Sequence, residues 1–270
     1  MPGDKDEYIT SKRILSGYTP MKEYENTILY GLRAVKEAVS SGKEFDRVFV
    51  QKGLKSELFG ELRKVLEDNK IPYQFVPTEK LNRITNNRNH QGIVAFISHI
   101  LYHRIEDVLP GLFEEGKTPL ILVLDRITDV RNFGAICRTA ECAGVQAVVI
   151  PAQGAAQVNG DAIKASAGAL HNIPVCREPN LKTAIDFLKE SGLQIVSITE
   201  KADEYYPEAD YSGPTALILG SEEDGISYEY LKKSDKRVKI PMAGKIESLN
   251  VSVAAGIVLF EAVKQRHKVS

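Results

Sequence analysis

Residues 240–256 combine a strand end, a glycine-containing loop and a helix start, an arrangement that can hold a small ligand. A β-like run ends at Pro241, and an apolar helix begins at Ser248 or Asn250, both favourable N-cap residues. Such a junction presents unpaired backbone N–H and C=O groups. Few of its side chains are charged, so the ligand need not be a polyphosphate. Ordinary helix capping explains the same residues equally well.

A second group of polar residues follows the apolar run at 120–124. Asn132 stands where a loop becomes a helix, so its side chain either caps that helix or faces a ligand. Arg138 follows a little under two helical turns later, among apolar neighbours. A guanidinium is costly to bury unless a carboxylate or a phosphate meets it. Arg138 therefore forms either a structural salt bridge or a contact with an RNA phosphate, and the spacing alone does not choose.

A third group follows the apolar run at 216–219. Gly220 and Gly225 allow a ligand to approach the backbone at the carboxyl end of a strand, where open α/β sheets bind ligands. The acidic residues at 222–224 would repel a polyphosphate, which argues against ATP or NAD and suits a cationic ligand. A solvated acidic turn is the alternative. The sequence contains no P-loop, and no GxGxxG follows a strand.

Strands that alternate with helices predict a parallel α/β sheet that positions these groups, in a domain at residues 118–270. Its expected strands lie at 120–124, 147–150, 195–198 and 216–219. Its expected helices lie at 134–143, 163–170, 184–189 and 251–265.

A smaller α/β domain is expected at residues 21–98, after a polar extension at 1–20 and before a partly helical linker at 99–117. Its expected strands lie at 28–30, 48–50, 75–76 and 93–96. Its expected helices lie at 31–39, 54–66 and 79–84.

Composition narrows the class of protein. The 270 residues are 43% hydrophobic and 26% charged, with no run long enough for a membrane helix. The charged N-terminus lacks a signal-peptide core, and the three cysteines have neither metal-ligand nor redox spacing, which predicts a cytoplasmic protein without a metal site. Residues 1–105 carry a net charge of +4 and residues 106–270 a net charge of −5. A mildly basic front half is compatible with RNA binding.

The three groups together resemble, in order and spacing, the signature of the SpoU/TrmH family of RNA ribose 2′-O-methyltransferases, within the SPOUT superfamily. The matching pieces are Asn132-x-Gly134-x-x-x-Arg138, Gly220-x-Glu222-x-x-Gly225, and Ile240-Pro241-Met242 followed by Ser248-Leu249-Asn250-Val251-Ser252. Tyr30-Gly31-x-x-Ala34-Val35 and His90-Gln91-Gly92-Ile93-Val94-Ala95 look like the family's N-terminal substrate-binding domain, which is similar to the ribosomal-protein L30e fold.

The resemblance implies an α/β SPOUT domain with a deep trefoil knot and a pocket for S-adenosylmethionine. It assigns the cofactor contacts to Gly220, Ile240, Met242 and Leu249. It places five residues in the catalytic neighbourhood: Asn132, Arg138, Glu222, Ser248 and Asn250. An arginine is effectively always protonated, so we expect Arg138 to hold an RNA phosphate and stabilise the developing alkoxide rather than to accept the proton.

The resemblance also implies partners. The 2′-hydroxyl distinguishes RNA from DNA, so DNA is not expected as a substrate. The basic residues expected to contact RNA are Lys80, Arg83, Arg88 and His90. A homodimer through the knotted domains is typical of the family, and a guanosine of large-subunit ribosomal RNA is the typical target of its two-domain branch. The alternatives are a transfer-RNA ribose as target, a catalytically silent RNA-binding protein, and a generic nucleotide-binding enzyme.

Overall fold

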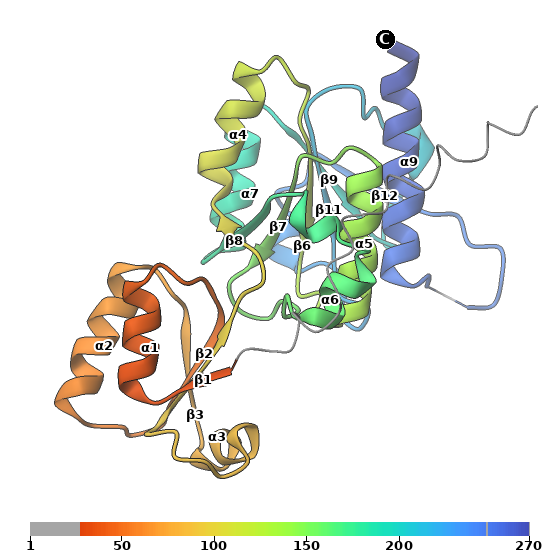
Figure 1. Ribbon diagram of the computed structural model, residues 1–270. Helices are drawn as coiled ribbons and strands as arrows, with labels where there is room; N and C mark the ends of the chain where they lie inside the picture. The colour runs from red at the N-terminus through yellow and green to blue at the C-terminus, as the bar shows by residue number, and fades with distance from the viewer. Residues whose placement is uncertain (1–27, 247, 270) are drawn as a thin grey trace, which may run out of the picture.

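The computed structural model describes residues 28–246 and 248–269, which form two α/β domains (Figure 1). The extension expected at residues 1–20 lies outside the described residues. In the N-terminal domain a four-stranded sheet has the order β1-β4-β2-β3, with β4 antiparallel to β1 and β2 and with β2 parallel to β3. Its strands are β1 (Ile28–Tyr30), β2 (Phe45–Gln51), β3 (Tyr73–Val76) and β4 (Ile93–Ile97).

Helices cover both faces of this sheet. Helices α1 (Leu32–Ser40) and α2 (Glu57–Asp68) pack on one face, and α3 (Thr78–Thr85) packs on the other. Helix α2 begins where it does because the Ser56 side chain accepts a hydrogen bond from the Phe59 N–H at 3.1 Å. The expected strands and helices of this domain are confirmed.

The C-terminal domain contains an eight-stranded, wholly parallel sheet of order β10-β12-β9-β11-β6-β7-β8-β5. Its two central strands, β6 (Leu120–Leu124) and β11 (Thr215–Leu219), are buried along their whole length, which explains their continuous apolar sequences. The remaining strands are β5 (Tyr102–His103), β7 (Ala147–Pro151), β8 (Val175–Glu178), β9 (Gln194–Ile198), β10 (Glu204–Tyr205) and β12 (Lys236–Lys239).

Two helical layers enclose the large sheet (Figure 1). Helices α5 (Val130–Cys142), α6 (Gly160–Ala165) and α9 (Val251–Val269) pack on one face. Helices α4 (Ile105–Glu114), α7 (Leu181–Glu190) and α8 (Tyr228–Leu231) pack on the other. The expected parallel α/β architecture is confirmed, and the trefoil knot remains a prediction.

Several elements differ from the expectation. Helix α5 begins four residues earlier than the expected start at residue 134, because the Asp129 carboxylate caps it by accepting from the Asn132 N–H at 2.7 Å. Strands β8 and β10 and helix α8 were not expected, since each is short and partly polar. No helix in the described part of the chain is long and apolar enough to cross a membrane.

The segment expected as a linker, residues 99–117, packs onto the C-terminal domain. It supplies the edge strand β5 and the helix α4, whose Ile105, Leu109 and Leu112 are buried. The buried Glu178 carboxylate anchors the start of α4, accepting from the Ile105 N–H at 2.8 Å and pairing with Arg104 at 2.8 Å. Burial raises the pKa of Glu178.

Close packing of α5 on α6 depends on Gly134. A Cβ at this position would lie 2.5 Å from the Ala165 Cβ and 2.7 Å from the Ala162 carbonyl oxygen. We expect Gly134→Ala to lower the free energy of unfolding by about 1–3 kcal/mol, because the two helices must move apart. The control is Gly111→Ala in α4, where a Cβ meets nothing within 4 Å and the substitution is expected to stabilise slightly. Urea unfolding followed by circular dichroism measures both; equal effects would contradict the packing argument.

Candidate active site

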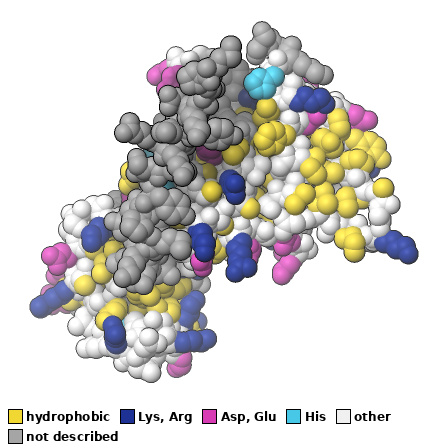
Figure 2. Space-filling view, turned by 45° about the vertical axis from the view of Figure 1, so that its right-hand side comes forward, with side chains coloured by type: hydrophobic (Ala, Val, Ile, Leu, Met, Phe, Trp, Pro, Cys, Tyr) yellow, Lys and Arg dark blue, Asp and Glu magenta, His cyan; other side chains and the backbone are white. Residues whose placement is uncertain are grey.

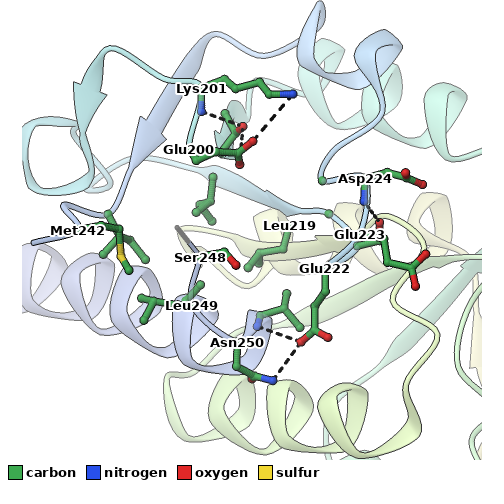
Figure 3. Close-up of a pocket in the computed structure, with 18 residues that line it drawn as sticks. Glu200, Lys201, Leu219, Glu222, Glu223, Asp224, Met242, Ser248, Leu249 and Asn250 are labelled. Carbon is green, nitrogen blue, oxygen red and sulfur yellow. Dashed lines mark hydrogen bonds and ion pairs between the residues drawn. The ribbon is translucent and has the colours of Figure 1, made fainter. Parts of the chain in front are cut away.

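A pocket of about 560 Å³ lies at the carboxyl ends of β9, β11 and β12 (Figure 3). The loops that follow these strands form its walls, together with the first turn of α9. Because parallel strands place their carboxyl ends at one edge of a sheet, segments far apart in the sequence meet here. Two of the three groups of chemistry-bearing residues, those at 220–225 and 240–256, line this pocket.

The four residues expected to contact the cofactor all line this pocket: Gly220, Ile240, Met242 and Leu249. Gly220 has a clear structural reason to be glycine. A Cβ on it would lie 2.1 Å from the Gly225 carbonyl carbon and 2.2 Å from the Ile226 nitrogen. The loop at 220–225 therefore folds back on itself so tightly that only a residue without a side chain fits at its start.

Three polar side chains from the three segments form one hydrogen-bonded cluster. The Glu222 Oε1 atom accepts from the Asn132 Nδ2 at 2.9 Å and from the Asn250 Nδ2 at 3.0 Å. Asn250 Nδ2 also donates to the Asn132 Oδ1 at 3.0 Å. Figure 3 shows Glu222 and Asn250 pointing toward each other, with Leu249 and Met242 to their left. We call these three residues the amide–carboxylate cluster.

The N-cap interactions of α5 and α9 determine which side-chain atoms of Asn132 and Asn250 face the cluster. Because Asp129 caps α5, the Asn132 side chain does not, and it bonds Glu222 instead, which excludes the capping role and leaves the contact with a ligand as a prediction. Asn250 caps α9 with its Oδ1 atom, accepting from the Ser252 N–H at 2.9 Å, while its amide NH2 group reaches the cluster. The Ser248 side chain lines the pocket just before α9 and is exposed.

Asp125 and Arg126 brace the loop at 220–225 from the neighbouring strand end. The Arg126 guanidinium lies 3.0 Å from Asp125 and 2.9 Å from Asp224, and donates to the Gly225 carbonyl at 3.1 Å. Hydrogen bonding to Asp125 raises the pKa of Arg126. The buried Asp125 also accepts from the Ser227 N–H and hydroxyl, both at 2.7 Å. These contacts of Asp125 and Arg126 were not predicted. The sequence does indicate them, because a charged pair directly follows a wholly apolar strand.

The pocket also contains residues that were not predicted. They are Thr199, Glu200 and Lys201, which follow β9, whereas Glu223 and Asp224 belong to the acidic turn that the sequence had already indicated for a cationic ligand. Their position in the sequence could have predicted them, because each follows a parallel strand and therefore lies at the edge of the sheet where α/β proteins bind ligands. In the described part of the chain, no group of three or more His, Cys, Asp or Glu residues could hold a metal ion.

Two of the expected catalytic residues, Asn132 and Arg138, do not line the pocket; Asn132 still reaches the pocket-lining Glu222 and Asn250 through hydrogen bonds, whereas Arg138 does not join the cluster. Arg138 is exposed on α5, about 9 Å along the helix from Asn132 at 1.5 Å per residue. Exposure also removes the need for a structural salt bridge.

The basic residues of the N-terminal domain lie on α3 and in the loop before β4. Arg83 is exposed, and the exposed Arg88 donates to the Tyr30 hydroxyl at 3.3 Å. The Lys80 ammonium lies 4.1 Å from the centre of the Phe49 ring. These three cations lie at the surface or at its edge.

His90 is placed differently. It is only 8% exposed, its Nδ1 accepts from the Gly92 N–H at 3.0 Å, and its Nε2 lies 2.9 Å from the Asn82 Oδ1. Both ring nitrogens are therefore used inside the protein. The expectation of a direct RNA contact by His90 is corrected: its ring orders the loop between α3 and β4.

Comparison with known proteins identifies the family. A model described as "SpoU rRNA Methylase family" matches residues 119–260, and one described as "RNA 2'-O ribose methyltransferase substrate binding" matches residues 28–102. The chain belongs to the SpoU methylase family. A Staphylococcus aureus protein named "Putative TrmH family tRNA/rRNA methyltransferase" is 35% identical over 245 residues, 91% of this chain and 98% of that protein.

Solved structures agree with this assignment. The AdoMet-bound rRNA methyltransferase of Sinorhizobium meliloti has a TM-score of 0.57 and 26% identity, covering 90% of this chain and 88% of that one. The SpoU methyltransferase AviRb of Streptomyces viridochromogenes shares the fold, with a TM-score of 0.57 at 24% identity and coverage of 90% and 91%.

This SpoU enzyme is an S-adenosylmethionine-dependent RNA 2′-O-ribose methyltransferase. The residues of the pocket fit the cofactor: Gly220 leaves room at the backbone, Ile240, Met242 and Leu249 offer apolar surface, and the acidic turn suits a cationic sulfonium. When bound, the cofactor supplies an electrophilic methyl group.

Gly220→Ala is expected to weaken S-adenosylmethionine binding by at least about 100-fold, since the loop at 220–225 must open to accommodate a Cβ and the pocket depends on that backbone. Isothermal titration calorimetry measures the effect. The control is Gly244→Ala in the loop before α9, where a Cβ meets nothing within 4 Å and affinity is expected to be retained. Unchanged affinity in Gly220→Ala would remove this loop from the cofactor site.

Proposed function

We propose that this enzyme methylates the ribose 2′-hydroxyl of a guanosine in large-subunit ribosomal RNA. The observation that carries the proposal is that the substrate-binding domain at residues 28–102 and the domain with the cofactor pocket are present in one chain. The Sinorhizobium meliloti rRNA methyltransferase matches 90% of this chain, across both domains. The structure titled "A. aeolicus TrmH/SpoU tRNA modifying enzyme" covers only 61%. Transfer RNA is the second candidate, because the curated relatives are named for both RNAs.

The amide–carboxylate cluster and Ser248 orient the ribose. Methyl transfer requires the 2′-oxygen to approach in line, so positioning supplies much of the catalysis. The Glu222 carboxylate holds the amides of Asn132 and Asn250 in fixed directions beside the pocket. The Ser248 hydroxyl, Asn132 and Asn250 are then in place to hydrogen-bond sugar hydroxyls. Recognition of the 2′-hydroxyl excludes DNA.

RNA selection is assigned to the N-terminal domain. Arg83 and Arg88 are exposed, and Lys80 lies against an aromatic ring, so all three offer positive charge to phosphates. His90 contributes indirectly, through the loop that it orders.

We place the enzyme in the cytoplasm, where its RNA substrates occur and where its three free cysteines stay reduced.

A homodimer explains both an apolar surface and the position of Arg138. Val253 and Phe260 are 50% and 51% exposed, two turns apart on one face of α9. Hydrophobic side chains gather on the side of the molecule that carries α9, at the right of Figure 2. Gly256 lies between them in the sequence and faces Thr139 of α5, the residue after Arg138, since a Cβ on Gly256 would lie 3.6 Å from the Thr139 methyl group. A second copy on this face therefore lies beside Arg138, and we assign the phosphate-binding role of Arg138 to the dimer rather than to the isolated chain.

The target RNA is tested by mapping ribose methylation. In cells that lack this protein, one guanosine of large-subunit ribosomal RNA is expected to lose its 2′-O-methyl group and become sensitive to alkaline hydrolysis. The purified enzyme should restore methylation with S-adenosylmethionine and unmodified ribosomal RNA. Loss of the mark in transfer RNA instead would select the second candidate, and absence of any lost mark would contradict both.

The role of Arg138 is tested by subunit complementation. Arg138→Ala and Glu222→Ala alone are each expected to lower turnover by about 100-fold, and Arg138→Ala also weakens RNA binding because it loses a phosphate contact. Because a mixed dimer holds one intact composite site, co-expression of the two variants should restore about a quarter of wild-type turnover. Glu190→Ala, at the end of α7 on the opposite face of the sheet, is the control for a lost carboxylate. If mixing restores nothing, or if Arg138→Ala keeps its turnover, this role is wrong.

A further inference from the structure

A second hollow, of about 390 Å³, lies between the two domains and is separate from the cofactor pocket. We call it the interdomain cleft. The N-terminal domain lines it with residues 46–48 and 72–74, and the C-terminal domain with Thr128, Val130, the loop at 150–157 and Arg177. Lys and Arg side chains lie on both sides of the notch between the domains (Figure 2). None of the proposed catalytic or cofactor-binding residues lines this cleft.

The floor of the cleft is a rigid junction. The Arg177 guanidinium lies 3.8 Å from the centre of the Tyr102 ring and donates to the Phe45 and Asp46 carbonyls at 2.8 and 3.2 Å. The Asp46 Oδ1 atom accepts from the Tyr102 hydroxyl at 2.7 Å and from the Val158 N–H at 3.2 Å. Arg177 and Asp46 are therefore committed to holding the two domains together, and the cleft is already formed without RNA.

The walls carry polar groups that are available to a ligand. Within residues 28–246 and 248–269, the side-chain amides of Gln74, Gln153 and Gln157 make no hydrogen bond. The Arg47 guanidinium makes one long hydrogen bond, to the Ala155 carbonyl at 3.4 Å. Amides carry both donors and acceptors and suit the edges of unpaired bases, and a guanidinium suits a phosphate. The charged lining residues are two arginines and one aspartate, a balance that favours an anion.

The cleft adjoins the methylation site through one short segment. Thr128 and Val130 line the cleft, and Asn132, two residues later on α5, belongs to the amide–carboxylate cluster. An RNA strand that reaches from the N-terminal domain to the cluster therefore has this cleft on its way.

We propose that the interdomain cleft binds one unpaired nucleotide of the RNA, close in sequence to the methylated one. Arg47 binds its phosphate, and Gln74, Gln153 and Gln157 contact its base. The cleft thus sets which RNA sequence can present its ribose to the pocket. This inference rests on the proposed function, since it requires RNA as the substrate.

Kinetics on unmodified large-subunit ribosomal RNA transcripts test the phosphate contact. We expect Arg47→Ala to raise the KM for RNA about tenfold, with S-adenosylmethionine affinity unchanged. Arg47→Lys should recover part of the loss, because it keeps the charge but not the planar fork. Lys64→Ala, an exposed cation on α2, controls for a lost positive charge. A KM for Arg47→Ala equal to that of Lys64→Ala would overturn the phosphate contact.

Base contact is tested by an abasic scan of a synthetic hairpin that carries the mapped nucleotide. For the wild type, removing one base near the target should lower kcat/KM about tenfold more than removing its neighbours. In the double variant Gln153→Ala/Gln157→Ala, removing the same base should lower kcat/KM no more than removing its neighbours, because the variant no longer contacts that base. If both proteins show the same scan, the cleft does not bind a base.

These results separate the inference from the proposed function. If the wild type binds S-adenosylmethionine but methylates neither ribosomal nor transfer RNA, the proposed function fails. If the wild type methylates RNA, but the Arg47 variants behave like the control and the abasic scan is unchanged, only the interdomain cleft is wrong. Retained cofactor affinity in every cleft variant shows that the C-terminal domain is folded.

Discussion

One carboxylate oxygen joins the three segments on which the active site depends. The Glu222 Oε1 atom accepts from amides that stand 90 and 28 residues away along the chain. It also lies 3.5 Å from the Val251 N–H at the start of α9. Charge-assisted hydrogen bonds of this kind are stronger and more directional than neutral ones. A shift of any one of the three segments therefore disturbs the other two, and the ribose site that we propose forms only when all three are in place.

The loop that carries Glu222 is held from both sides. At its start, Gly220 packs against the backbone of Gly225 at a distance that a Cβ would forbid. At its end, Arg126 reaches across from β6 to bond Asp224 and the Gly225 carbonyl. The acidic turn is thus neutralised on its outer side by Arg126, while its inner side faces the cofactor pocket. A turn with this charge needs such a brace to stay tightly folded.

Sequence patterns predicted the layers and most of the pocket, because those depend on local chemistry. Continuous apolar runs marked the buried strands β6 and β11, and helix-start chemistry marked Asn250. Long-range contacts were not predicted. Nothing local shows that the Arg126 brace exists, that His90 is turned inward, or that the segment at 99–117 packs onto the second domain. Each of these is decided by which surfaces meet after folding.

Residues 125–132 connect the interdomain cleft to the amide–carboxylate cluster and to the acidic turn. Arg126 at the start of this segment braces the acidic turn, Val130 lines the interdomain cleft, and Asn132 joins the amide–carboxylate cluster. These groups share eight residues of backbone, fixed at one end by the buried strand β6 and at the other by helix α5. A nucleotide in the proposed cleft site therefore contacts the same short segment that carries the Asn132 amide, to which we assign the orientation of the ribose. The Arg177 junction bonds the two domains to each other beside the cleft, so the proposed nucleotide site and the amide–carboxylate cluster are both formed before RNA binds, which is the preorganisation that a positioning mechanism requires.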